Sequence, residues 1–128
     1  MDRYLLDTHV VLWLATDPSK LSEKVVEILT SNAAKSISVA SAWEVAIKLS
    51  QNKLEFLQGG IDAFYRIADS SNLTIIGVEK SYLEVVENLD FIHKDPFDRL
   101  IIATAKAQEM AIITIDENIQ KYDVDWIW

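Results

Sequence analysis

The chain has 128 residues, half of them hydrophobic, with a formal net charge of −8 and no cysteine. This length and hydrophobic content predict one domain, residues 1–128, with enough apolar side chains for a core. The lack of cysteine excludes disulfides, thiolate metal ligands and cysteine nucleophiles, and the negative charge argues against a generally basic surface for nucleic acid. A nucleic-acid substrate would therefore need a local basic strip or bound cations.

Membrane-spanning and export segments are not expected from the sequence. No uninterrupted apolar run approaches the ~18 residues that cross a bilayer. The apolar stretch at the start of the chain is too short for a signal peptide. These features predict a protein of the cytoplasm.

Short β-like runs alternate along the chain with helical patterns. Such an alternation implies an α/β fold, in which a mainly parallel sheet has helices on both faces. The expected strands cover residues 3–6, 36–39, 73–77 and 111–115, with a last edge strand within 122–128. The expected helices cover about 10–14, 22–30, 40–49, 61–69, 80–88, 96–110 and 117–122.

The stretch from His93 to Ala105 carries the clearest helix start. Asp95 is followed by Pro96, and an aspartate can accept the free N–H groups of a first turn while proline suits the first helical position. Asp98 is three residues past this cap, on the face that carries Ile101 and the other apolar residues of the helix. Two interpretations of Asp98 remain open: a first-turn charge favoured by the helix dipole, or a carboxylate placed for chemistry.

Four acidic residues fall where strands end or helices begin. Asp7 ends the first strand, Glu44 opens the helix after the second, Asp98 opens the helix before the strand at 111–115, and Asp116 ends that strand. In a parallel α/β sheet these positions share the carboxyl edge, where ligand sites lie. For Glu44 an alternative stays open, because Ser41-x-x-Glu44 also fits a capping box.

Four carboxylates at one edge would repel one another and require a counter-charge. Hard divalent cations with oxygen ligands supply it, so the sequence predicts a site for Mg²⁺, with Mn²⁺ as a possible substitute. Such sites commonly also bind substrate phosphate, and the chemistry they indicate is metal-assisted hydrolysis of a phosphodiester.

Further residues have two interpretations each. Thr114 lies two residues before Asp116 and would hydrogen-bond a ligand carboxylate, or simply suit a strand. Arg99 would clamp phosphate or pair with an acid of a partner, or be a solvated helix-surface arginine. Trp13 and Trp43 are expected in the core, or alternatively in a groove for a partner helix.

Five short motifs follow one another along the whole chain: Asp7-Thr8-His9 with Leu12-Trp13, Ser41-x-Trp43-Glu44-x-Ala46-x-Lys48, His93-Lys94-Asp95-Pro96-Phe97-Asp98-Arg99, Ile113-Thr114-x-Asp116, and Tyr122-x-Val124-x-x-Ile127-Trp128. Together these motifs resemble PIN-domain ribonucleases of the VapC toxin type.

The resemblance implies a PIN-like three-layer α/β/α sandwich with a five-stranded, mainly parallel sheet. It implies a Mg²⁺-dependent endoribonuclease that cleaves RNA and is inhibited by a cognate VapB-type antitoxin. It also implies a homodimer, which binds operator DNA only through the antitoxin. The acidic positions of the family map onto Asp7, Glu44, Asp98 and Asp116, which are therefore the expected catalytic and metal-binding residues.

Two other classes have similar sheets and acidic edges. A non-enzymatic receiver-like signalling domain with an acidic metal site needs adjacent acids after its first strand and a phosphoacceptor aspartate after its third. Here Asp7 is single, and the third strand runs into Ile76-Gly77-Val78. A haloacid-dehalogenase-like phosphatase needs Asp-x-Asp, where this chain has Asp7-Thr8-His9. Both patterns fail.

Overall fold

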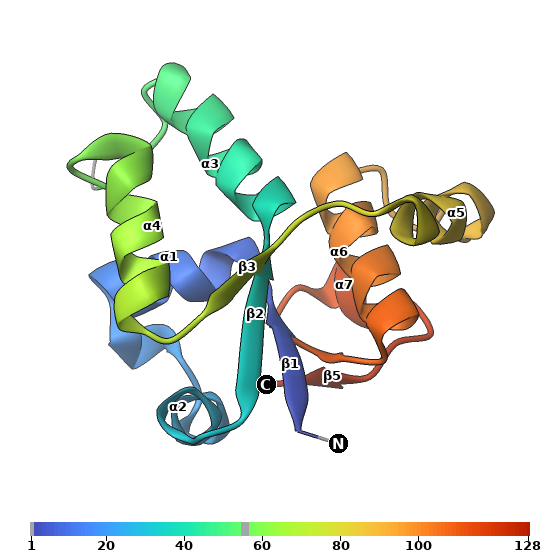
Figure 1. The fold of residues 1–128 in the computed structure, drawn as a ribbon, viewed down its shortest axis with the longest axis horizontal. Coiled ribbons are helices and arrows are strands. Elements are labelled where there is room, and N and C mark those ends of the chain that lie inside the picture. The colour runs from blue at the N-terminus through green and yellow to red at the C-terminus, as the bar shows by residue number, and fades with distance from the viewer. Residues whose placement is uncertain (1, 55–56) are drawn as a thin grey trace.

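The computed structural model describes residues 2–54 and 57–128, and it places five parallel strands in one sheet (Figure 1). The strand order is β3-β2-β1-β4-β5, and every neighbouring pair is parallel. The strands are β1 Arg3–Leu6, β2 Ala34–Ser38, β3 Thr74–Ile76, β4 Ala111–Ile113 and β5 Trp126–Ile127. The expected parallel five-stranded sheet is confirmed.

The helices between the strands lie on both faces of this sheet (Figure 1). Helices α1, α2, α3 and α4 lie on one face, while α5, α6 and α7 lie on the other. Their bounds are α1 Thr8–Thr16, the 3-10 turn η1 Pro18–Lys20, α2 Glu23–Thr30, α3 Val39–Ser50, α4 Gly60–Ser70, α5 Lys80–Asn88, α6 Pro96–Gln108 and α7 Glu117–Gln120.

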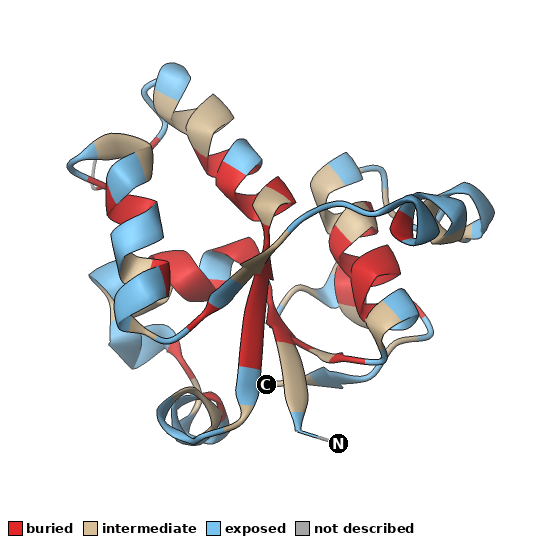
Figure 2. Cartoon of the chain, in the orientation of Figure 1, coloured by how far each residue is buried: buried red, intermediate tan, exposed pale blue. Residues whose placement is uncertain are grey.

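The alternation of side chains along the central strands separates two buried clusters. Leu6 and Ile113 pack with α1, α3 and α4, whereas Leu5 and Ile112 pack with α6. Successive residues of a strand point to opposite faces, so each apolar pair of β1 and β4 supplies both clusters. Figure 2 shows the burial concentrated on the central strands and on the helix faces toward them. The three-layer arrangement follows from this pattern.

The register of the sheet aligns the carboxyl ends of its central strands. Leu6 pairs with Ile113, and the backbone N–H of Asp7 donates to the Ile113 carbonyl at 3.0 Å. Asp7 and the segment after β4 are thereby tied together at one edge. Topology also contradicts the receiver-like alternative, because the doubly wound order of that class is 2-1-3-4-5, whereas β1 is central here between β2 and β4.

Most elements begin or end within about two residues of the expected position, and two of the shifted boundaries lie next to the acidic residues. Helix α3 begins at Val39, because the Ser38 hydroxyl accepts from the Ala40 N–H and caps it. The capping box proposed for Ser41 and Glu44 is therefore wrong. Strand β4 ends at Ile113, two residues earlier than expected, because the chain then turns toward the cap of α7 at Asp116. No helix among the described residues is long and apolar enough to cross a membrane.

Candidate active site

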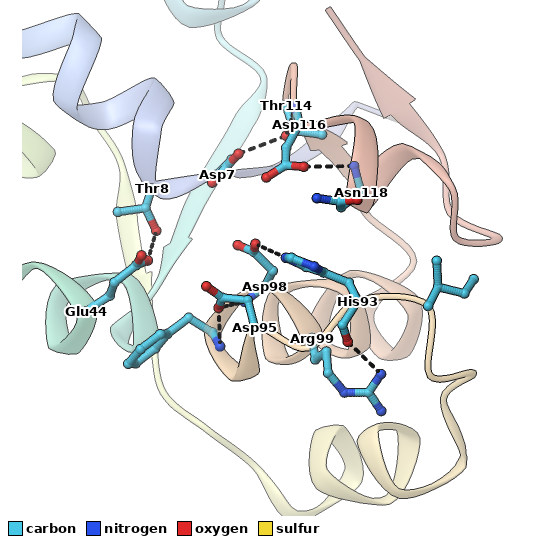
Figure 3. A network of polar contacts seen from close by, with 12 residues as sticks. Asp7, Thr8, Glu44, His93, Asp95, Asp98, Arg99, Thr114, Asp116 and Asn118 are labelled. Atoms are coloured by element: carbon cyan, nitrogen blue, oxygen red, sulfur yellow. Dashed lines mark hydrogen bonds and ion pairs between the residues drawn. The ribbon is translucent and has the colours of Figure 1, made fainter.

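Asp7 occupies the centre of the acidic edge. It links the end of β1 to the start of α1, and only 2% of its surface is exposed. The Thr114 hydroxyl donates to Asp7 Oδ2 at 2.8 Å (Figure 3). This confirms that Thr114 hydrogen-bonds a carboxylate of the edge. The carboxylate that it contacts belongs to Asp7, which directly follows the neighbouring strand β1.

Asp98 and Asp116 face each other across this edge, with His93 beside them (Figure 3). One ligand atom of each of the three residues lies within 4.8 Å of the other two. His93 Nε2 lies 2.9 Å from Asp98 Oδ2, and Asp116 Oδ1 accepts from the Asn118 N–H at 2.8 Å. Three elements supply these groups: the loop before α6, the first turn of α6 and the cap of α7.

The negative charges of Asp7, Asp98 and Asp116 repel one another. Burial raises the pKa of Asp7, and the nearby Asp116 adds a smaller contribution in the same direction. Burial also raises the pKa of Asp98 to about 7, with further contributions from the charges of Asp7 and Asp95. Desolvation and like charges both favour the protonated acid. His9 lowers the pKa of Asp7 and His93 lowers that of Asp98, but each of these contributions is smaller than that of burial.

The donor set fits a divalent cation. Carboxylate oxygens are the ligands that Mg²⁺ and Mn²⁺ prefer, and Asp98 and Asp116 offer them within a few ångströms. A positive ion would also hold Asp7 and Asp98 in the ionised form that burial disfavours. The residues that would hold it are Asp7, Asp98 and Asp116, with His93 adjacent.

Glu44 is buried but sits to one side of the three aspartates, beside Thr8 (Figure 3). Its Oε1 accepts from the Thr8 hydroxyl at 2.9 Å, and its Oε2 lies 3.0 Å from Lys48 Nζ. Thr8 is also hydrogen-bonded to Ser41. Glu44 thus has its own cation and is not part of the closely spaced group formed by His93, Asp98 and Asp116. Its role as a metal ligand stays a prediction.

Asp95 is the helix cap that the sequence indicated. Its Oδ1 accepts from the backbone N–H groups of Phe97 and Asp98, at 2.8 and 3.0 Å. Pro96 occupies the first turn of α6. This geometry separates the two aspartates, because Asp95 satisfies the helix terminus and leaves the carboxylate of Asp98 free to face Asp116.

Both interpretations of Arg99 as a surface residue are wrong. Its side chain is buried and donates to the carbonyls of Asp90 and Leu89 and to the Tyr122 hydroxyl. The same hydroxyl accepts from the His93 N–H at 2.8 Å. Arg99 and Tyr122 therefore hold the loop that carries His93. A set of backbone carbonyls that accepts from one arginine has no signature in the sequence.

His93 is the site residue that the sequence analysis missed. His93 is the first residue of the motif that ends at Arg99, but the motif by itself predicts no role for it. Its contact with Asp98 spans five positions, from a loop into a helix, so helical periodicity does not reveal it. The start of the motif at His93 was the only available signal. His9, in contrast, is exposed and lines a shallow cavity of about 210 Å³ with Asp7, Trp13, Ile115 and Asp116.

The expectation that Trp43 is in the core is also wrong. Its surface is 63% exposed, and its ring makes an edge-on contact with that of Phe97, with centroids 5.2 Å apart. Trp43 lies on α3 directly before Glu44, on the side of the helix away from the apolar cluster. Trp13 is partly buried and does pack against the core.

Strand order and this group of aspartates define an α/β protein with a carboxylate site at the carboxyl edge of a parallel sheet. The family model described as PIN domain matches residues 4–125. The chain belongs to the PIN-domain family.

Similarity to individual proteins points the same way. The chain is 24% identical over 123 residues to Ribonuclease VapC22 of Mycobacterium tuberculosis, across 95% of this chain and 93% of that protein. This similarity agrees with the resemblance to VapC-type proteins found in the motifs.

Solved structures share the fold over nearly the whole chain. VapBC2 from Rickettsia felis, bound to a DNA fragment from its promoter, matches with a TM-score of 0.73 and 16% identity over 97% of this chain and 96% of that one. A toxin-antitoxin complex from Klebsiella pneumoniae matches with a TM-score of 0.66 and 19% identity, over 98% and 96%. DNA-bound VapBC from Salmonella typhimurium matches with a TM-score of 0.68 and 12% identity, over 99% and 98%.

Proposed function

We propose that this PIN-domain protein is a Mg²⁺-dependent endoribonuclease and the toxin of a VapBC-type pair. One observation carries the proposal: Asp7, Asp98 and Asp116 converge at the carboxyl edge while burial and mutual repulsion raise the pKa of two of them. The similarity to Ribonuclease VapC22 supports RNA as the substrate. An RNA target would place the activity in the cytoplasm.

Each residue of the proposed site has a distinct task. Asp7, Asp98 and Asp116 hold the cation, and Glu44 completes the acidic set from α3. A divalent cation there supplies charge neutralisation for the carboxylates and the phosphate and lowers the pKa of the attacking water. Thr114 fixes the orientation of the Asp7 carboxylate through its hydrogen bond. His93, bonded to Asp98, orients that carboxylate from the other side.

Cleavage of RNA by the purified protein tests the nuclease proposal. Single-stranded RNA should be cut with Mg²⁺ or Mn²⁺, and cutting should stop when EDTA removes the cation. Re-addition of Mg²⁺ should restore it, which separates loss of the metal from loss of the fold. Undiminished cleavage in EDTA would show that the reaction does not use this site as proposed.

The partners in the proposal are a VapB-type antitoxin and a second copy of the chain. The solved relatives include toxin-antitoxin complexes, some of them bound to DNA, and we propose that operator DNA is contacted through the antitoxin. Expression of the chain alone should arrest growth, and co-expression with the small protein of the neighbouring gene should relieve the arrest. Normal growth with active ribonuclease present would remove the toxin role and leave the nuclease one.

A further inference from the structure

An exposed aromatic pair borders the acidic edge. Trp43 immediately precedes Glu44 on α3, and Phe97 immediately precedes Asp98 on α6. Their rings meet at 5.2 Å with an interplanar angle of 77°. The pair therefore joins two helices that carry proposed site residues near their N-termini, Glu44 in the second turn of α3 and Asp98 in the first turn of α6. Each ring lies one residue away from one of these acids along the chain.

Exposure of this tryptophan costs hydrophobic free energy that burial would recover. Trp43 nevertheless presents 63% of its surface, more than the other exposed tryptophan, Trp126, at 44%. Phe97 is half-buried in the first turn of α6 and supports one side of the Trp43 ring. Such support limits the motion of the ring, so the entropy lost on binding a ligand is smaller.

Two basic side chains beside the acidic edge are already engaged. Lys48 pairs with Glu44 at 3.0 Å, and Arg99 is buried among backbone carbonyls. The chain as a whole carries a net charge of −8. Contacts between these side chains and phosphate are thus a weak source of affinity for RNA. Base stacking on aromatic rings depends little on charge and supplies affinity where phosphate contacts are few.

We propose that Trp43, supported by Phe97, stacks on a base of single-stranded RNA next to the phosphate that is cleaved. The inference rests on the proposed ribonuclease function and adds to it a substrate-binding surface. Stacking needs an unpaired base, so the surface selects single-stranded RNA over duplex. It tolerates every base, because each has a π-face.

Variants of Trp43 test the contribution of the ring. Trp43→Ala should raise KM for single-stranded RNA by about 5- to 140-fold, the loss expected for one stacked base, with kcat much less affected. Trp43→Phe should restore most of the affinity. Trp126→Ala is the matched control, because it removes a similarly exposed tryptophan from β5, and its KM should equal that of wild type.

Salt distinguishes stacking from phosphate contacts. The Kd for RNA is measured in an Asp116→Asn background, where cleavage should be prevented. In this background the Kd of the Trp43→Ala variant, divided by the Kd of the protein that keeps Trp43, should be the same at low and high salt, because the substitution removes no phosphate contact. A ratio that disappears as salt rises would overturn the stacking proposal.

Abasic RNA tests the same contact without relying on the fold of a variant. A single abasic nucleotide is moved step by step through an oligonucleotide that wild type cleaves. The penalty in Kd or KM should peak at a nucleotide flanking the cleaved bond, and Trp43→Ala should abolish that peak, as a double-mutant cycle requires. A flat profile in wild type would overturn the inference.

The outcomes separate this inference from the function on which it rests. If wild type does not cleave RNA, both fall. If wild type cleaves and Trp43→Ala has an unchanged KM, only the stacking surface is wrong. A third result, dissociation of a dimer or loss of antitoxin binding by Trp43→Ala with an unchanged Kd for RNA, would assign the aromatic pair to a protein interface and overturn the proposal.

Discussion

The two ends of the acidic edge balance their negative charge in different ways. On the α3 side, Glu44 accepts from Thr8 and pairs with Lys48, so its charge is compensated within the protein. On the β4 and α6 side, Asp7 and Asp98 have raised pKa values, caused first by burial and then by neighbouring charges. The comparison shows that acids at the same sheet edge differ in how strongly they require an external cation.

That difference has a structural origin. Lys48 lies four residues after Glu44 on α3, the spacing at which helical side chains meet. Asp7 and Asp116 come from segments next to parallel strands, and Asp98 from the first turn of a helix, so no such local spacing supplies a cation to them. The aspartate side therefore stores the repulsion that a metal ion would relieve.

Removal of a single aspartate should have the largest effect. Asp7→Asn or Asp116→Asn should lower RNA cleavage by more than about 100-fold, above the 10- to 100-fold typical of residues that only orient a metal ligand. Thr114→Val should lower RNA cleavage by about 10- to 100-fold, since it removes the hydrogen bond that orients Asp7. Asp123→Asn, an exposed acid outside the edge, should keep wild-type activity. If Asp7→Asn kept an activity close to that of wild type, the aspartate side of the edge would not be the part that requires the cation.

The sequence predicted the fold well because its signals were local. Alternating apolar runs and helical patterns determine the strands and layers, and the Asp95-Pro96 cap is visible as two adjacent residues. The acidic residues were found because topology alone sends strand ends and helix starts to one edge. Convergence of Asp7, Asp98 and Asp116 is therefore a consequence of the connection order.

Contacts between distant residues were not predictable in the same way. The sequence reading placed Arg99 on the surface, whereas it is buried on carbonyls of a loop that precedes it. It placed Trp43 in the core, because the helical pattern of α3 does not show which flank the neighbouring helices leave uncovered. Ser41 fitted a capping box, but Ser38 caps α3 and leaves Ser41 to bond with Thr8. Each error concerns a partner far away in sequence or a boundary shifted by a few residues.

Arg99 tests how far the aspartate side depends on its supporting loop. Arg99→Met should lower the free energy of unfolding by about 3 kcal/mol, because it removes the hydrogen bonds that the charged guanidinium donates to the Leu89 and Asp90 carbonyls and to the Tyr122 hydroxyl. Lys106→Met, on the same helix, loses one exposed bond to the Asp123 carbonyl and should change stability by less than about 0.5 kcal/mol. Urea unfolding measures both. Equal effects of the two variants would contradict the supporting role of Arg99.

pH should reveal the uncompensated charge in metal-free protein. The pKa of Asp98 is raised from 3.8 to about 7 by burial and by Asp7 and Asp95, so the folded state keeps a proton that the unfolded chain releases. The stabilisation is complete below the unfolded pKa and is lost as pH rises through the folded one. The free energy of unfolding in EDTA should therefore fall between about pH 4 and pH 7. Asp98→Asn should flatten this decrease, and an unchanged slope would show that another group titrates.

Substitutions of the two aspartates at the start of α6, the cap Asp95 and the first-turn Asp98, should change stability in opposite ways. Asp95→Ala should cost about 0.5–2 kcal/mol of stability, since it removes the cap of the helix. Asp98→Asn should leave metal-free stability unchanged or raised, because relief of repulsion offsets a dipole interaction of ~0.3–1 kcal/mol. Thermal unfolding with and without Mg²⁺ measures this, and Mg²⁺ should raise the Tm of Asp95→Ala but have little effect on Asp98→Asn. The reverse pattern would exchange the roles of the two residues.

Substitution of Glu44 should have the smallest effect on Mg²⁺ affinity, and it directly compares the Glu44 side of the edge with the aspartate side. Glu44→Gln removes a charge that Lys48 already compensates, so Mg²⁺ affinity, measured by titration calorimetry, should fall less than in Asp7→Asn. Cleavage of RNA should still decrease, because Glu44 belongs to the proposed acidic set. Lys48→Met frees the Glu44 carboxylate from its 3.0 Å partner and should strengthen Mg²⁺ binding, since the cation then meets one more uncompensated charge. Weaker Mg²⁺ binding in Lys48→Met would mean that Lys48 positions Glu44 for the metal, and the two ends of the edge would then act as one site.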